Sequence, residues 1–133
     1  STHNFQFLQE KAIELTNLVR YSSIGKDYPP PVRKCISYIK ENLEKKLTLG
    51  GLSKVCSLSP DYLSALFKKT TGQNISRFIL RQKLELSKSL LNGKYDYSEI
   101  SCYLSFCSES YFIYCFKREY GVTPREYAKA LKY

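Results

Sequence analysis

The sequence predicts an all-α protein with two homeodomain-like, three-helix subdomains, each holding a helix-turn-helix, joined by a long linking helix. An extra helix is predicted at the N-terminus. Three observations predict this class: apolar residues recur at helical spacing, no segment alternates convincingly with a period of two, and one pattern occurs twice. Two copies are too few for a solenoid, so the repeat indicates a duplicated subdomain.

The two copies share serines, aromatic residues, a lysine and a glycine in the same order. The first copy runs from Leu52 to Gly72, and the second from Ile100 to Gly121. The second copy carries one extra residue, which falls in the turn between its two helices. Each copy reads as a short helix, a tight turn and a second helix, which is the arrangement of a helix-turn-helix unit.

A proline-rich stretch marks the main boundary. Residues 22–31 contain a glycine and three consecutive prolines, which forbid a continuous helix. We therefore expect residues 1–28 to hold a helix from Phe5 to Arg20 and a linker, both belonging with an upstream domain through which any dimer would form. The rest is expected to comprise a first subdomain at 29–73, the linking helix at 74–92 and a second subdomain at 93–133.

The linking helix is predicted from its cap, its stop and its composition. Asn74 is a natural N-cap, and Asn92 with Gly93 forms a C-terminal stop. An apolar stripe that includes Ile79 runs along one side, and Lys83 is placed with other basic residues on the remaining faces. Because its interior contains neither Gly nor Pro, the helix is expected to be a stiff spacer.

Capping residues predict where the shorter helices start. The candidate N-caps are Thr48, Ser59, Ser108 and Thr123, and Ser98 is expected to open the short helix through Ile100 and Leu104. Ser59 and Thr123 are each followed by a proline, which suits the first position of a helix.

The charge distribution favours a polyanion as partner. The formal net charge is +9, and residues 1–28 are neutral, so the whole excess lies in the segment that holds the repeat. No apolar run approaches the length of a membrane span, and no N-terminal signal is present, so no membrane is expected.

Residues that would support catalysis or metal binding are lacking from the sequence. There is no Ser/His/Asp set and no glycine-rich phosphate loop, and His3 is the only histidine. The five cysteines show no CxxC spacing, and four lie at or near apolar helix positions, which predicts buried, reduced thiols in a cytoplasmic protein. We expect no enzyme activity, no cofactor and no metal.

The repeat also carries a family resemblance. Ile100-Ser101, Ser110-Tyr111-Phe112, Phe116-Lys117 and Gly121-Val122-Thr123-Pro124 resemble the AraC/XylS family of bacterial transcription regulators, and the likeness extends from Val32 to Tyr127. The resemblance implies a sequence-specific domain that places two recognition helices in successive major grooves of duplex DNA. It also implies an activator that holds RNA polymerase at a promoter.

The sequence departs from the family pattern at a few helix and turn positions. Ser53, Ser87 and Ser101 stand where Ala is usual, Ser57 and Ser105 where Gly is usual in the turns, and Lys83 where Arg is usual. Because Ser adopts the turn conformation only at some cost, we expect slightly strained turns.

By position, the resemblance assigns candidate DNA contacts to each recognition helix. The expected base readers are Pro60, Asp61, Ser64 and Ala65 in the first, and Glu109, Ser110, Ile113 and Tyr114 in the second. The expected phosphate contacts are Lys68, Lys69, Arg77, Arg81, Lys117 and Arg118. The residues assigned to the core are Tyr62, Leu63, Leu66, Phe67, Tyr111, Phe112, Cys115 and Phe116.

Several of these assignments have a second interpretation. Asp61 and Glu109 could complement the helix dipole instead of accepting from cytosine, and Arg77 and Arg81 could be a solvated helix face. The competing function is a basic helical module that binds RNA or an acidic protein. RNA readers stack bases on exposed aromatic residues, whereas most aromatic residues here are predicted to be core.

Overall fold

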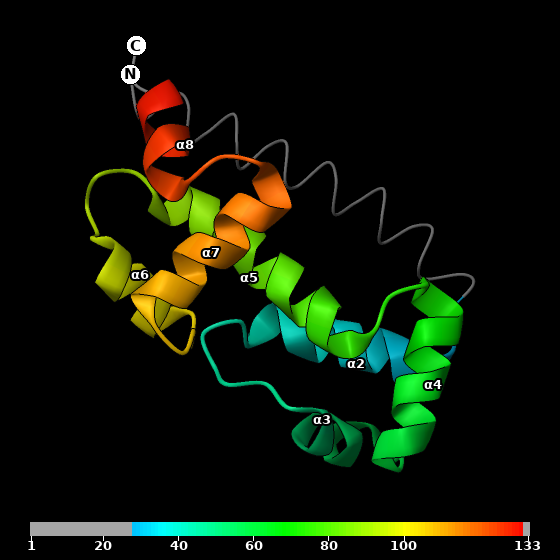
Figure 1. Ribbon diagram of the computed structural model, residues 1–133. Helices are drawn as coiled ribbons and strands as arrows, with labels where there is room; N and C mark the ends of the chain where they lie inside the picture. Colours follow the sequence, from blue (N-terminus) through cyan, green and yellow to red (C-terminus); the bar gives the residue numbers. More distant parts are fainter. Residues whose placement is uncertain (1–27, 132–133) are drawn as a thin grey trace. The chain divides into compact units, whose positions relative to one another are not determined.

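The computed structural model describes residues 28–131, and every regular element in that range is a helix. Figure 1 shows the helices in chain order. They are α2 (Pro30–Glu41), α3 (Leu49–Cys56), α4 (Pro60–Thr71), α5 (Ile75–Leu90), α6 (Tyr97–Tyr103), α7 (Glu109–Tyr120) and α8 (Pro124–Ala130). The predicted all-α class is confirmed, while the helix predicted over residues 5–20 lies outside the described residues.

The described chain forms two compact units. The first unit comprises residues 28–41 and 48–75, with α2, α3 and α4. The second comprises residues 42–47 and 76–131, with most of α5 and all of α6, α7 and α8. The segment 42–47, placed in the first subdomain from the sequence, thus belongs to the second unit, and so does nearly all of the linking helix.

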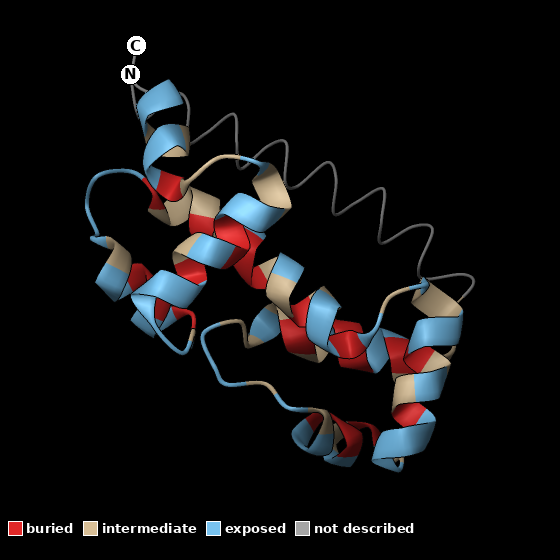
Figure 2. Ribbon diagram, viewed as in Figure 1, coloured by how far each residue is buried: buried red, intermediate tan, exposed pale blue. Residues whose placement is uncertain are grey.

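The first unit is held together by the apolar stripes of its three helices. Figure 2 shows the buried residues on the facing sides of α2, α3 and α4. The core residues of this unit are Val32, Cys35, Ile36, Ile39, Leu52, Cys56, Leu63, Phe67 and Ile75.

The second unit has an aromatic core. Leu84 of α5 and Leu91, which follows this helix, are buried with residues of α6 and α7, which explains why most of α5 belongs to this unit. The Phe116 ring packs edge-on against Tyr120 and Tyr127, with centroids 4.7 and 5.7 Å away. Phe112 lies between the rings of Phe116 and Phe106, at 6.0 and 5.2 Å.

The two turns have the same backbone geometry. Ser57 and Ser105 adopt the left-handed conformation, with φ of 56° and 58°, and are the two non-glycine residues with positive φ in the described chain. After each, an N–H bonds back to a carbonyl five residues earlier, Leu58 to Ser53 at 3.0 Å and Phe106 to Ser101 at 2.8 Å. This is the Schellman pattern with Ser in the position usual for Gly, so the expected strain is present in both turns.

The three serines in place of the usual Ala are buried and satisfied. The hydroxyls of Ser53, Ser87 and Ser101 donate to carbonyls three residues back, at 2.7, 2.5 and 2.9 Å. Because each hydroxyl has a partner, burial carries no desolvation penalty for an unpaired group.

Two predictions about helix starts and burial are wrong. α6 begins at Tyr97 rather than at Ser98, because Asp96 and Glu99 form a reciprocal capping box. Tyr62 and Tyr111 were predicted to be core, but they are 57% and 44% exposed. Each occupies the third position of its helix, one residue before the buried apolar stripe.

The thiols divide into two groups. Cys35, Cys56 and Cys115 are buried, while Cys102 and Cys107 are exposed, so three thiols are buried where four were predicted. Burial and the neighbouring Cys56 thiol raise the pKa of Cys35 to about 12, so this thiol stays protonated and unreactive.

Candidate nucleic-acid interface

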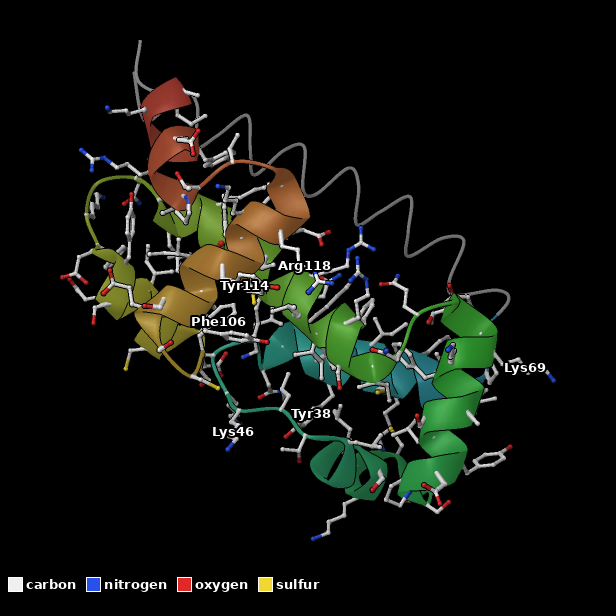
Figure 3. The ribbon with its side chains drawn as sticks, viewed as in Figure 1. Tyr38, Lys46, Lys69, Phe106, Tyr114 and Arg118 are labelled. Carbon is white, nitrogen blue, oxygen red and sulfur yellow. The ribbon has the colours of Figure 1, made fainter. Side chains whose placement is uncertain are left out.

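The first candidate surface lies on α4. Its helix starts at the Ser59 cap, whose side chain accepts from the Tyr62 N–H at 3.2 Å, and ends at Gly72. Of the predicted contacts on this helix, Ser64 is half-buried and the others are exposed, namely Pro60, Asp61, Ala65, Lys68 and Lys69. Lys69 projects away from the helix (Figure 3). The exposed predicted contacts near the start of α4 therefore have small side chains, and its lysines lie in the last turn.

The second candidate surface lies on α7, which is built in the same way. Ser108 caps it by accepting from the Tyr111 N–H at 3.0 Å, and Gly121 ends it. Ile113, predicted as an exposed reader, is half-buried and packs against the core of the second unit. The exposed predicted contacts on α7 are Glu109, Ser110, Tyr114, Lys117 and Arg118.

Tyr114 and Arg118 form a pair on this surface. An Arg118 guanidinium N–H donates to the Tyr114 hydroxyl over 3.3 Å, and Tyr114 is 58% exposed. Figure 3 shows the two side chains next to each other on α7. The Arg118 guanidinium thus contacts the large, exposed side chain of Tyr114 in the middle of α7.

Two of the predicted phosphate contacts are engaged by an acid of their own unit. The Glu119 carboxylate lies 2.8 Å from Arg81 Nε and 3.8 Å from Arg77 Nη2. Both arginine side chains are about half exposed, whereas that of Glu119 is mostly covered. Phosphate would therefore have to compete with Glu119 for these two cations.

Sequence reasoning missed the two exposed tyrosines at the helix starts. Tyr62 and Tyr111 occupy matching positions, and each backbone N–H bonds to the serine cap of its helix. A hydrogen bond with the Cys115 thiol and the proximity of that thiol raise the pKa of Tyr111. Leu63 and Phe67 lie four residues apart and are the buried residues of α4, so their spacing in the sequence indicated which side of this helix is buried.

A buried lysine lies beneath the second unit's turn. Lys83 is 6% exposed, and its ammonium donates to the carbonyls of Leu104, Leu43 and Lys45 at 2.6, 2.7 and 2.8 Å. Desolvation lowers its pKa, and Glu44 partly offsets this. The sequence analysis placed Lys83 with the basic residues on the faces away from the apolar stripe, but the residue is buried, and three carbonyls satisfy all three of its donors.

Other kinds of site find no support in the described chain. Within residues 28–131, no group of three or more His, Cys, Asp and Glu side chains is placed to hold a metal ion. No helix in that range is long and apolar enough to cross a bilayer.

Known proteins share this architecture. A family model described as a helix-turn-helix domain matches residues 52–130, which is more than half of the chain. The probable transcriptional regulator LumQ of Photobacterium leiognathi is 34% identical over 92 residues, covering 68% of this chain and 37% of LumQ. The chain belongs to the AraC/XylS family.

Solved structures of two regulator domains have the same fold. The C-terminal domain of AraT, a response regulator from Geobacillus stearothermophilus, matches with a TM-score of 0.74 at 26% identity, over 79% of this chain and 88% of that one. The DNA-binding domain of AdpA, solved with a target DNA, matches with a TM-score of 0.71 over 77% of this chain and 93% of that one. At 20% identity this second likeness shows the fold alone.

The chain spans only part of the length of the curated relatives that it matches. It covers 33–42% of the length of the first curated relatives. The family membership nevertheless identifies α4 and α7 as the second helices of two helix-turn-helix units, since both lie within the matched residues. Lys83, where this family usually has Arg, replaces a planar fork of donors by a compact ammonium that is saturated by three carbonyls.

Proposed function

We propose that this segment binds duplex DNA sequence-specifically as part of a transcription regulator. The observation that carries the proposal is the duplicated helix-turn-helix, with α4 and α7 each presenting exposed residues in a chain whose net charge is +9. Membership of the AraC/XylS family supports it.

In this function the exposed N-terminal residues of each second helix read base edges. On α4 these are Asp61 and Ala65, and on α7 they are Ser110 and Tyr114. Lys68 and Lys117 lie one turn further along their helices, where a cation anchors the backbone and carries no base information. Arg77 and Arg81 join the phosphate contacts once DNA displaces Glu119.

The two helices are proposed to enter successive major grooves on one DNA face. Such grooves lie about 34 Å apart, or roughly ten base pairs. α5, the expected spacer, is a continuous helix of 16 residues with neither Gly nor Pro. The regulator is proposed to act in the cytoplasm as an activator that contacts RNA polymerase, and to have no enzyme activity.

Spacing of the half-sites tests this proposal. A duplex obtained by in vitro selection with this chain is compared with versions carrying about five or ten extra base pairs between the half-sites. Both insertions should lower specific affinity toward that of a single half-site, because one rotates a half-site to the far face and the other moves it out of reach. Equal affinity for all three duplexes would show that only one unit reads DNA.

A second candidate function is RNA binding, and the exposed tyrosines are the observation that favours it. Tyr62, Tyr111 and Tyr114 offer aromatic faces on which unpaired bases could stack. Competition between a selected duplex and a structured RNA of equal length separates the two functions. Displacement by the RNA at lower concentration than by the unlabelled duplex would favour the second.

A further inference from the structure

We propose that the segment 42–47 is an additional DNA-contacting element of the second unit, in which Lys45 and Lys46 bind backbone phosphates beside the groove that α7 enters. This inference rests on the proposed function and names a contact that neither the repeat nor the helix-turn-helix pattern contains. Figure 1 shows the segment as the connection between α2 and α3.

The backbone of this segment is fixed to the second unit at three consecutive carbonyls. Those of Leu43 and Lys45 accept from the buried Lys83 ammonium, at 2.7 and 2.8 Å. The carbonyl between them, that of Glu44, accepts from the Ser105 hydroxyl at 2.7 Å. Hydrogen bonds to three consecutive carbonyls therefore hold the backbone of this segment in place, although the segment forms neither a helix nor a strand.

The place of attachment is the turn that leads into α7. Ser105 is the left-handed residue of that turn, and the Lys83 ammonium also binds the carbonyl of Leu104, the residue that ends α6. The N-cap of α7, Ser108, follows three residues after Ser105. In a helix-turn-helix the start of the second helix meets the bases, so the groups bordering its turn face the flanking backbone.

The side chains that this attachment presents are basic. Lys45 and Lys46 are exposed, and neither forms an ion pair with a described residue. Figure 3 shows Lys46 projecting outward from the segment. Glu44 is the acid next to them, and it partly offsets the lowering of the pKa of Lys83.

Pre-ordering of the backbone is what distinguishes these lysines from an ordinary solvated surface. A phosphate contact made from a mobile loop loses free energy to the ordering of that loop, whereas a contact made from a fixed backbone loses only side-chain freedom. Because three carbonyls of this segment are already hydrogen-bonded in the folded protein, DNA binding would not cost the free energy of ordering its backbone.

The first test removes the charges. Lys45→Ala together with Lys46→Ala should reduce the slope of log K against log salt by nearly two for a mixed-sequence duplex, since each phosphate contact contributes about 0.9. The double Lys→Arg variant should restore the slope. Lys94→Ala with Lys129→Ala is the matched control, because these exposed lysines lie elsewhere in the same unit, and its slope should remain that of the unaltered chain.

The second test loosens the attachment and leaves the charges in place. Ser105→Gly removes the hydroxyl bound to Glu44 without adding strain at a positive φ, and circular dichroism checks that the helices persist. The affinity for the mixed-sequence duplex should fall a few-fold, with a smaller loss when Lys45 and Lys46 are already Ala.

The outcomes separate this inference from the proposed function. If the unaltered chain binds a selected duplex but the lysine variants keep its salt slope, the segment does not contact phosphate and the inference is overturned, while the function stands. If the slope falls equally in the Lys94 and Lys129 control, the effect belongs to net charge and the inference is again overturned. If the unaltered chain binds no duplex DNA, both fall together.

Discussion

The first and second units build the same helix-turn-helix from the same local devices, yet they present different surfaces. Both turns contain a left-handed serine, and both second helices start at a serine cap and end at a left-handed glycine, Gly72 or Gly121. On the exposed side, however, Ala65 of α4 occupies the position of Tyr114 of α7. The backbone pattern has been kept through the duplication, and the exposed residues have not.

The difference follows from where the constraints lie. Caps, left-handed residues and buried rings fix the backbone through contacts within each unit, so few residue types fit there. An exposed side chain on a helix contacts few other residues of its own protein. Its identity can therefore change with the binding partner without altering the fold. The two units should therefore be alike in how they fold and unlike in what they read.

The largest expected effect sharpens the comparison of the two cores. Leu63 and Phe112 are matching, fully buried residues, but Phe112 also packs against two other rings. Phe112→Ala should lower the free energy of unfolding by roughly 3–5 kcal/mol, with about 0.5–1.5 kcal/mol more for each ring pair that is lost. Leu63→Ala should cost roughly 2–5 kcal/mol. Denaturant unfolding of both variants is the measurement, and a larger loss for Leu63→Ala would contradict the stronger aromatic core.

The next effect concerns the exposed residues that differ. Tyr114→Ala should weaken the preference for one base over another at one or two positions of the second half-site. The penalty for a mismatched base pair there, about 1–3 kcal/mol of binding free energy in the unaltered chain, should be lost. The slope of log K against log salt should stay nearly unchanged. Ser64→Ala, a change at a half-buried position on α4, should alter preference less. In vitro selection of sites with each variant measures both. A uniform loss on specific and random duplexes would remove Tyr114 from the base readers.

A smaller effect is expected from the acid found in only one unit. Glu119 binds Arg77 and Arg81, and the matching position of the first unit is Thr70. Glu119→Gln should release both arginines for phosphate, and so raise affinity for mixed-sequence DNA about tenfold at low salt. The slope of log K against log salt should steepen by the amount expected for up to two additional phosphate contacts.

Removing an acid elsewhere is the control for that change. Glu41→Gln deletes the same charge from an exposed position on α2, and it should change affinity by less than about twofold because distant charges are screened. An equal gain from both variants would mean that total charge, and not release of the two arginines, sets the affinity.

The smallest effect tests the two turns. Ser57 is exposed, and its hydroxyl bonds to no described residue, so Ser57→Gly should stabilise the chain by about 1 kcal/mol through relief of the left-handed strain. Ser105→Gly should give less, or a net loss, because it also deletes the bond to Glu44, which is worth about 1 kcal/mol. Thermal unfolding of the two variants gives the order, and equal shifts would show that the Ser105 bond contributes nothing.

The sequence alone was sufficient for the repeated skeleton. Thr48, Ser59, Ser108 and Thr123 cap helices as predicted, because an N-cap is a local interaction among residues three apart. The predicted start of α6 at Ser98 is wrong, because Asp96, two residues earlier, caps this helix reciprocally with Glu99.

What could not be predicted depends on contacts distant in sequence. Lys83 was placed on a polar face because it is charged, and its burial makes sense only once the carbonyls of Leu43, Lys45 and Leu104 surround it. Tyr62 and Tyr111 were assigned to the core together with the apolar residues of their helices, but each lies outside the buried stripe of its helix and is exposed. Periodicity gave the helices, and the packing partners decided which faces were covered.

The attachment of residues 42–47 has a consequence for how the two units can be taken apart. The second unit is discontinuous along the chain: its Lys83 and Ser105 reach back 40 and 61 residues to Leu43 and Glu44, and the intervening chain includes α3 and α4 of the first unit. A fragment that begins at residue 76 would keep the buried ammonium of Lys83 with one carbonyl in place of three. A fragment designed to contain the complete second unit must therefore also include residues 42–47.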